Sequence, residues 1–132
     1  MSEEFKIEII NPEKSFLHKD NILEVVVPAF EGEMGILKDH ISIISFLKPG
    51  ILKVFSKNGE EKYYVEDGIL EFKDNLLSIL TSSIFDVDKV EINFIAQTLE
   101  ESEKKLEKDD LDDQKRFLLT QKIDVLKNIR SN

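Results

Sequence analysis

The chain has 132 residues, 41% of them hydrophobic and 34% charged, with a formal net charge of -9. This length suits one compact domain, or one small domain with an appendage. The acidic balance argues against a nucleic-acid backbone or an anionic membrane face as the main partner. The chain has no cysteine, no apolar run near the roughly 20 residues that span a bilayer, and no signal or transit pattern in its first residues. We therefore expect a soluble protein that meets a membrane only through a partner and does not bind nucleic acid.

Short apolar runs broken by turn residues fill residues 5–85, a pattern typical of antiparallel β structure. Residues 5–9 alternate between apolar and polar, as a half-buried strand does. Residues 22–27 form an apolar, largely β-branched run that ends at Pro28, which cannot donate to a sheet ladder. Many short strands at near-regular spacing favour a sandwich or a flattened barrel.

Turn residues divide these runs at four places. Asn58-Gly59 lies between two apolar runs and predicts a β-hairpin. Asp67-Gly68 and Asp74-Asn75 predict two further reversals. The sequence Lys48-Pro49-Gly50 predicts a type II turn, in which the proline fixes its own φ and Gly50 takes the positive-φ position.

Glycine and proline disappear after Asp86, and the apolar period becomes that of a helix. Asp88, with Glu91 three residues later, predicts the start of a first helix. The apolar stripe of that helix consists of Ile92, Ile95, Ala96, Leu99 and Leu106.

A second helix is predicted after the acidic run at residues 107–113, with Asp109 or Asp110 as its cap. Two helices joined by a short polar link form an antiparallel hairpin. The expected fold is therefore mainly β plus α: an N-terminal antiparallel β-sandwich (residues 1–86), followed by a C-terminal antiparallel two-helix hairpin (residues 87–132). The stripe of the second helix consists of Leu111, Leu118, Val125 and Ile129, widened by Leu119 and Leu126.

The sequence carries no pattern of catalytic or cofactor-binding residues. His18 and His40 are the two histidines, and neither has metal-ligand spacing to other ligands. There is no Walker-type glycine loop to hold a phosphate. The many acids form no defined pair and are typical of a solvated face. We therefore predict a protein without catalytic activity, metal or cofactor.

The segment 28–40 contains two glycines that flank Glu33 and Met34. Glycine is used where the backbone needs positive φ or approaches another chain closely. A shaped loop without a nucleophile or phosphate cradle is suited to docking, because binding surfaces tend to lie on loops held by a rigid scaffold. From the residues alone, an ordinary strand connection that packs its apolar side chains into the core explains the segment better.

Several short motifs follow one another in a diagnostic order: residues 31–37 (EGEMGIL), His40, residues 48–52 (KPGIL), residues 68–71 (GILE) and residues 80–81 (LT). With a charged helical tail behind them, they make the whole chain resemble the epsilon subunits of F-type ATP synthases. The chain departs from the family at Lys38-Asp39, where Pro-Gly is usual, and at Ile41-Ser42, where Ala-Pro is usual.

The resemblance implies a β-sandwich followed by a helical hairpin. It also implies a non-catalytic rotor subunit of the central stalk that couples rotation of the c-ring through subunit γ to ATP synthesis. The c-ring contacts implied are Glu31, Glu33, Met34, Gly35 and His40. The γ contacts implied are Ile10, Asn11, Pro12, Thr81 and Phe85.

The resemblance further implies that the hairpin can open along γ and inhibit ATP hydrolysis, where it meets α and β subunits. Residues 114–132 contain five bases and one acid, so the tail is basic within an acidic chain. The basic face consists of Lys115, Arg116, Lys122, Lys127 and Arg130.

Some relatives bind ATP at the start of the first helix through an aspartate, an arginine and an alanine. Asp88 is present here, but Glu91 and Ile92 stand where the arginine and alanine would be. A carboxylate repels phosphate, so no nucleotide site is expected.

The expected location is the cytoplasmic face of the bacterial inner membrane, with the stromal face of the plastid thylakoid as a second setting. A stand-alone β-sandwich binding module with a helical interaction tail remains an alternative, as does a small carboxylate-dependent hydrolase. The module would need an aromatic platform, but Tyr63 and Tyr64 are adjacent and point to opposite faces of a strand.

Overall fold

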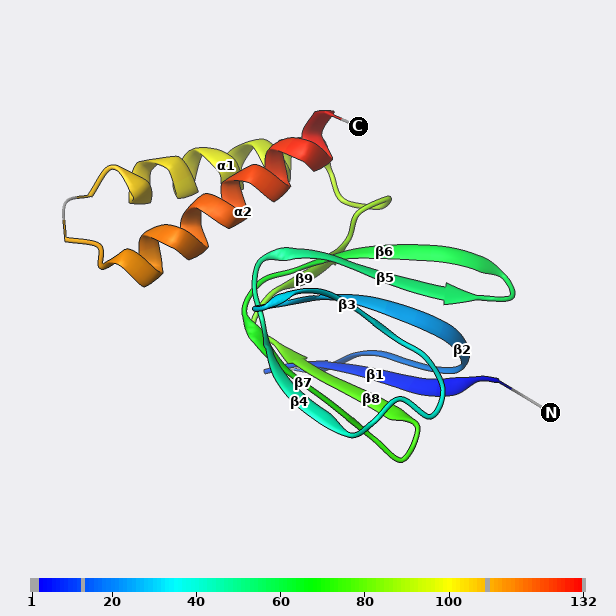
Figure 1. The fold of residues 1–132 in the computed structure, drawn as a ribbon. Helices are drawn as coiled ribbons and strands as arrows, with labels where there is room; N and C mark the ends of the chain where they lie inside the picture. Colours follow the sequence, from blue (N-terminus) through cyan, green and yellow to red (C-terminus); the bar gives the residue numbers. More distant parts are fainter. Residues whose placement is uncertain (1–2, 13, 109, 132) are drawn as a thin grey trace.

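The computed structural model describes residues 3–12, 14–108 and 110–131, and within them a β-sandwich is followed by a helical hairpin (Figure 1). The strands are β1 (Phe5–Asn11), β2 (Lys14–Ala29), β3 (Gly32–Ile36), β4 (Ile43–Leu47), β5 (Gly50–Ser56), β6 (Gly59–Val65), β7 (Gly68–Lys73), β8 (Leu76–Thr81) and β9 (Ile84–Asp86). The helices are α1 (Ile92–Leu106) and α2 (Asp113–Ser131). The predicted fold class is confirmed.

The strands form two layers that close on one another through the long strand β2. The neighbour order is β1-β8-β7-β4-β2-β5-β6-β9, with β3 paired to β2 and a further pairing between β1 and β2. Every pairing is antiparallel except that of β1 with β8. The first part of β2 pairs with β1 and its later part with β3 and β5, so this strand passes from one layer to the other.

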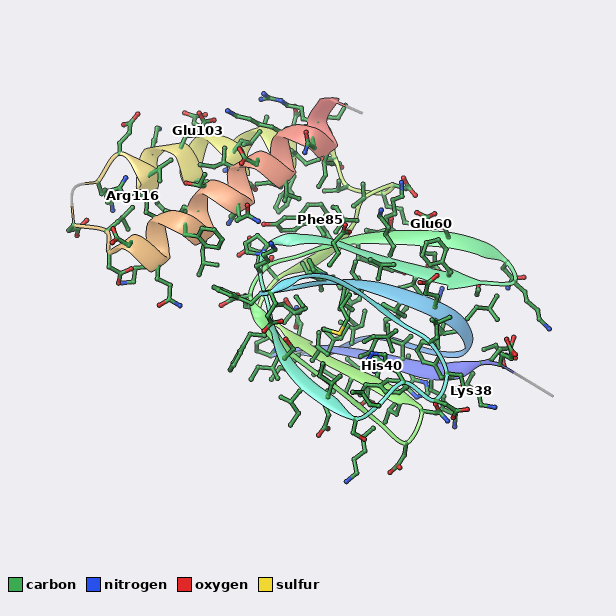
Figure 2. The ribbon with its side chains drawn as sticks, in the orientation of Figure 1. Lys38, His40, Glu60, Phe85, Glu103 and Arg116 are labelled. Atoms are coloured by element: carbon green, nitrogen blue, oxygen red, sulfur yellow. The ribbon has the colours of Figure 1, made fainter. Side chains whose placement is uncertain are left out.

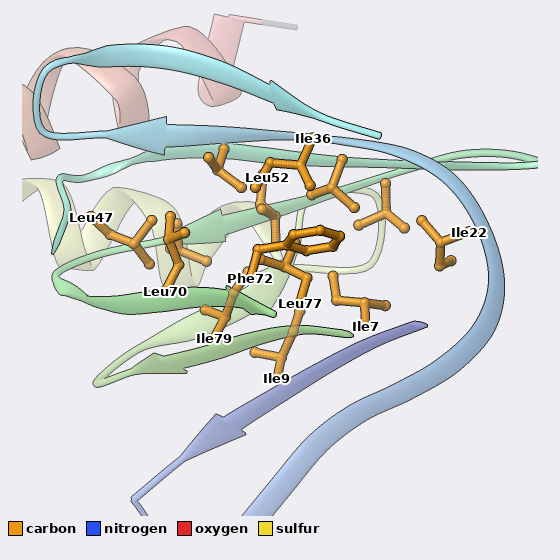
Figure 3. Packing of buried hydrophobic residues seen from close by; sticks show 14 of the residues in the cluster. Ile7, Ile9, Ile22, Ile36, Leu47, Leu52, Leu70, Phe72, Leu77 and Ile79 are labelled. Atoms are coloured by element: carbon orange, nitrogen blue, oxygen red, sulfur yellow. The ribbon is translucent and has the colours of Figure 1, made fainter. Parts of the chain in front are cut away.

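The core lies between the two layers and consists of inward-facing aliphatic and aromatic side chains (Figure 3). Phe5, Ile7 and Ile9 are buried there, as their alternation predicts. Phe5 meets Phe72 of β7 edge to face, with ring centroids 5.6 Å apart. Burying side chains of this size supplies about 1.5–3 kcal/mol each, so this interior is the main source of stability of the sandwich.

The predicted turns are confirmed at two positions. Ser56 pairs with Gly59 at the first hairpin, where Gly59 has a φ of +123°. Asp74 and Asn75 form a two-residue turn between β7 and β8 with φ of 52° and 59°, the geometry of a type I′ hairpin. Asp67-Gly68 instead connects β6 to β7, which are not neighbours in the sheet.

Two glycines are required for close approach rather than for positive φ. The predicted type II turn is wrong, because Gly50 has no positive φ. A Cβ at Gly50 would lie 2.5 Å from the Cβ of Pro28, and a Cβ at Gly68 would lie 2.1 Å from the carbonyl oxygen of Leu80. Neither position has room for a side chain.

Both helix starts differ from the prediction. The carboxylate of Asp86 accepts the N–H of Asp88, which keeps residues 86–90 in a turn, and α1 begins only at Ile92. The second helix is capped by Asp112, whose Oδ1 accepts the N–H of Lys115 at 2.8 Å. Asp110 is therefore not the cap, and Asp109 lies outside the described residues.

The hairpin packs on the outer face of β5, β6 and β9 through a second apolar cluster. Tyr64 projects outward from β6 and stacks on Phe85, with centroids 4.8 Å apart. The buried helix residues in this cluster are Ile95, Leu99, Ile123 and Leu126. The predicted stripes are thus correct in part, since Ile92 and Ala96 are exposed and Ile123 was missed.

Gly68→Ala is expected to lower the free energy of unfolding by about 3 kcal/mol or more, because its Cβ would overlap backbone rather than a flexible side chain. A urea titration followed by circular dichroism measures this. Gly59→Ala is the matched control: nothing lies within 4 Å of its Cβ position, so only the positive φ costs free energy, about 1 kcal/mol. Equal losses for the two variants would contradict the close contact with Leu80.

Candidate functional site

The outer face of β1, β8, β7 and β4 carries a row of exposed apolar side chains, called here the apolar strip: Ile10, Leu80, Ile69 and Phe46. These residues are successive partners across the four strands, and paired residues project to the same face. Their exposed fractions range from 40% to 61%. Contiguous exposed apolar surface of this kind marks an interaction site.

The next row on the same face is largely polar. It runs Ile44, Glu71, Ser78 and Glu8, and the hydroxyl of Ser78 donates to the carboxylate of Glu8 at 2.9 Å. The apolar strip is therefore one row wide at the end of the sandwich nearest the start of α2.

Phe30 extends the strip toward the hairpin. Its N–H donates to the carbonyl of Phe46 at 2.8 Å, which places the β2–β3 turn beside the strip. The Phe30 ring lies 6.0 Å from that of Phe117 in α2, and both rings remain partly exposed. The strip thus continues from the sandwich onto the helical hairpin.

The five predicted γ contacts differ in position and in exposure. Ile10 belongs to the apolar strip, Asn11 is half-buried and Pro12 is exposed beside it. Thr81 is buried, and its hydroxyl donates to the carbonyl oxygens of Asp67 and Ser83, so it offers no outward contact. Phe85 is enclosed between Tyr64 and Phe94 beneath the hairpin. With the hairpin closed, these two residues present less outward surface than Ile10 does.

Sequence reasoning missed Phe46 and Ile69. Residues 43–47 read Ile-Ile-Ser-Phe-Leu, so apolar residues occur on both faces of this strand. The pattern therefore gives no signal for which side faces outward. The register of β4 with β7 determines which side faces outward, because Leu47 and Ser45 are buried and Phe46 is not.

The predicted c-ring residues also fall into two groups. Glu31 lies in the β2–β3 turn, where its Oε2 accepts the hydroxyl of Ser45 at 3.1 Å. Glu33 and Gly35 are exposed on β3, and the half-buried Met34 packs against the core. These four residues share one end and edge of the sandwich.

His40 lies at the other end of the sandwich, apart from these four residues (Figure 2). Leu47 of β4 pairs with Ala29 next to the β2–β3 turn, whereas the His40 ring meets Phe72, the partner of Ile43 at the opposite end of β4. The contiguity of these residues in sequence is lost because β3 runs between them.

An ion pair ties the hairpin to the sandwich. The ammonium group of Lys122 lies 2.7 Å from Oε1 of Glu66, and both side chains are about one-fifth exposed. The hydroxyl of Tyr64 donates to the same oxygen at 3.2 Å. Burial, with the Glu66 charge second, raises the pKa of Tyr64, so this hydroxyl stays a donor.

The predicted basic face is not a free surface. Lys122 is engaged by Glu66, and the guanidinium of Arg116 donates to the carbonyls of Leu106 and Lys108 at the end of α1 (Figure 2). Arg130 lies in a groove between the helices with Glu100, Glu103 and Glu107. Lys115 and Lys127 are exposed on α2.

The described residues form no group of three or more acidic or histidine side chains suited to a metal ion. At the degenerate nucleotide motif, Asp88 is exposed, Glu91 caps α1 through its backbone and Ile92 is exposed. Tyr63 and Tyr64 face opposite ways and are both buried, so they form no aromatic platform. Neither helix, over its described residues, is long and apolar enough to cross a membrane.

Several known proteins are similar to this chain in sequence. The model of the beta-sandwich domain of the ATP synthase delta/epsilon chain matches residues 4–87. The ATP synthase epsilon chain of Pelagibacter ubique (strain HTCC1062) is 65% identical over 129 residues, which cover 98% of this chain and 99% of that one. The sodium ion specific epsilon chain of Propionigenium modestum is 33% identical over 89% of this chain and 84% of its own length.

Solved structures share the fold. A chain of the Euglena gracilis mitochondrial ATP synthase (OSCP/F1/c-ring) aligns with a TM-score of 0.74 at 20% identity, over 99% of this chain and 82% of that one. A chain of the Tetrahymena thermophila central stalk and c-ring structure aligns with a TM-score of 0.64 at 14% identity, over 98% of both chains. The chain therefore belongs to the ATP synthase delta/epsilon family, as an epsilon-type, non-catalytic subunit of a bacterial F-type ATP synthase.

Proposed function

We propose that the chain is a rotor subunit of the central stalk and that its sandwich docks on subunit γ through the apolar strip. The observation that carries this proposal is the exposure of four paired apolar side chains in one row of a sheet face whose next row is largely polar. Burying the exposed half of such a side chain contributes about 1 kcal/mol. Four of them contribute about 4 kcal/mol, or roughly a thousandfold in affinity.

The β2–β3 turn is the part that faces the polar loops of the c-ring in this proposal. Glu33 and Gly35 are exposed there, and the carboxylate of Glu31 is held in place by Ser45. Acidic groups at a turn suit polar loops that carry basic side chains. The sandwich, residues 1–86, would then clamp the foot of γ to the ring. It would carry ion-driven rotation to the catalytic subunits at the cytoplasmic face of the inner membrane.

The hairpin, residues 87–132, acts as a conditional brake. In the closed conformation Lys122 is bound to Glu66, and Arg116 holds the end of α1. The basic face becomes complete only when the hairpin leaves the sandwich and opens. It then meets α and an acidic segment of β and blocks rotation in the hydrolysis direction. The ion pair between Lys122 and Glu66 therefore opposes inhibition.

Phe46→Ser is expected to weaken binding to an epsilon-free αβγ complex about tenfold, because one exposed ring of the strip no longer contributes its burial. Ile41→Ser is the control, since Ile41 is more exposed than Phe46 but lies at the His40 end. Titration of the complex with fluorescently labelled chain measures both affinities. Equal effects of the two substitutions would contradict docking through the strip.

Glu66→Gln is expected to open the hairpin about tenfold more often and to strengthen inhibition of ATP hydrolysis, because Lys122 loses its ionic partner. The chain has no cysteine, so dyes on Lys57→Cys and Glu107→Cys report the distance from the sandwich to the hairpin tip by energy transfer. Glu60→Gln removes the same charge from a pair within the sandwich, Glu60 with Lys62, and serves as the control. The proposal fails if Glu66→Gln leaves both the energy transfer and the hydrolysis rate at the control values.

ATP is expected to produce no binding heat at micromolar concentrations of the chain. The carboxylate of Glu91 and the bulk of Ile92 occupy the positions where a nucleotide-binding relative has an arginine and an alanine. Isothermal titration calorimetry tests this, with magnesium present. A dissociation constant in the low micromolar range would overturn the expectation.

A further inference from the structure

The chain between β9 and α1 forms a short turn of helix that is interrupted before α1 begins. The carbonyl oxygen of Asp86 accepts the N–H of Val90 at 3.1 Å, which is the bond of an α-helical turn. The bonds of α1 start at Glu91, whose carbonyl oxygen accepts the N–H of Ile95. Glu91 itself is extended, with a φ of -77° and a ψ of 140°. Since its φ already suits a helix, a change of ψ alone would bring Glu91 into the helical region.

The interrupted turn carries the cap that α1 lacks. Oδ1 of Asp86 accepts the N–H of Asp88 at 2.9 Å, which is the bond that an N-cap aspartate makes to the second residue of a helix. Asp88 also places a negative charge where the helix dipole is positive. Within the described part of the chain, the start of α1 has neither support, since Glu91 makes no side-chain cap bond and the first turn holds no acid. Val87 is therefore a better first residue for this helix than Ile92.

The sequence also suits a helix that continues through the interruption. Residues 86–106 contain no glycine or proline. Val87, Val90 and Phe94 recur at the spacing of one face of a helix, although the closed conformation divides them between two segments. The local sequence therefore favours one longer helix, and the interruption needs a cause elsewhere in the structure.

Packing of the closed hairpin supplies that cause. Val87 and Val90 pack against the same apolar cluster that buries Ile95 and Leu99. In a continuous helix, which turns about 100° per residue, the two pairs would point roughly a third of a turn apart. They would then not both face that cluster. The interruption at Glu91 lets both pairs pack on it, but only while the hairpin is closed.

We propose that residues 86–91 are the hinge of the hairpin, and that Glu91 becomes helical on opening, so that the turn and α1 join into one helix from Val87 to Leu106. The inference rests on the proposed opening of the hairpin, and it adds where and how the chain moves. Joining forms backbone hydrogen bonds from the N–H groups of residues 91–94 to the carbonyls of residues 87–90. These bonds offset part of the burial that Val87 and Val90 lose when the hairpin leaves the sandwich.

Ile92→Pro tests the hinge by fixing the interruption. Proline is favoured as the first residue of a helix, and the residue before a proline favours the extended conformation that Glu91 has in the closed hairpin. Ile92 is 72% exposed, so the closed conformation loses little contact. In the joined helix the same proline removes a hydrogen bond and clashes with the carbonyl of Asp88. The ratio of open to closed hairpin is expected to fall about a hundredfold.

Ile92→Ala is the matched control, because it removes the same side chain and leaves the backbone free to become helical. Each substitution is combined with Glu66→Gln, which favours opening. Energy transfer between dyes on Lys57→Cys and Glu107→Cys measures the open fraction of the full-length chain, alone and bound to the αβγ complex. The proline chain is expected to bind the complex with unchanged affinity, to stay closed and not to inhibit ATP hydrolysis. The alanine chain is expected to open and to inhibit.

Amide hydrogen exchange of the Glu66→Gln chain in the inhibited complex gives a second readout that needs no proline. The N–H groups of Glu91 and Asn93 are expected to exchange at least tenfold more slowly than in the closed free chain, because the joined helix gives each a carbonyl partner. Unchanged or faster exchange overturns the inference, since the hinge is then a flexible linker.

The outcomes separate the hinge from the brake. If the proline chain opens and inhibits as the alanine chain does, the hinge is overturned while the proposed brake stands. If the hairpin of Glu66→Gln never opens in the complex, the brake fails and the hinge fails with it.

Discussion

Alternation of side chains across the strands is the constraint on which this structure depends. A strand of the sandwich has one face in the core, so every apolar residue on its other face needs a separate partner. The outer face of β5, β6 and β9 finds one within the chain, because the hairpin covers Tyr64 and Phe85. The outer face of β1, β8, β7 and β4 has no such cover over the strip, and Phe46 and Leu80 remain exposed. The outer face that carries the strip is therefore the one to which the proposed docking on γ is assigned.

The hairpin is held on the sandwich less firmly than the residues of the strip are held in their strands. The hairpin rests on a small apolar cluster and one ion pair, Lys122 with Glu66, that is only partly shielded from water. A partly exposed ion pair of this kind contributes about 1 kcal/mol or less and weakens in salt. Such a contact can be broken and remade without unfolding the sandwich. The strip, in contrast, is fixed to four strands that share the main core, so its side chains stay in place when the hairpin moves.

Much of the fold follows from local sequence, but the sites follow only in part. Alternation and turn residues such as Asp74-Asn75 predict the sandwich because their information is local. The start of α1 is not predicted, since the carboxylate of Asp86 competes for the N–H of Asp88 and keeps the chain in a turn. The strip depends on strand register, which a single apolar run such as residues 43–47 does not specify. The distance of His40 from the β2–β3 turn is not predicted either, because β3 separates residues that are close in sequence.

In the proposed role the sandwich must form a stiff connection between γ and the ring, and the position of Gly68 bears on that stiffness. The β7 backbone approaches the carbonyl of Leu80 too closely for any side chain, which locks β7 against β8 directly beneath the strip. A force on Ile69 or Leu80 therefore passes into paired backbones rather than into a mobile loop. The hairpin packs mainly on the other face, through the cluster around Tyr64. Under the proposed function, such a subunit changes the state of its hairpin without loosening the clamp, because the strands beneath the strip belong to the main core.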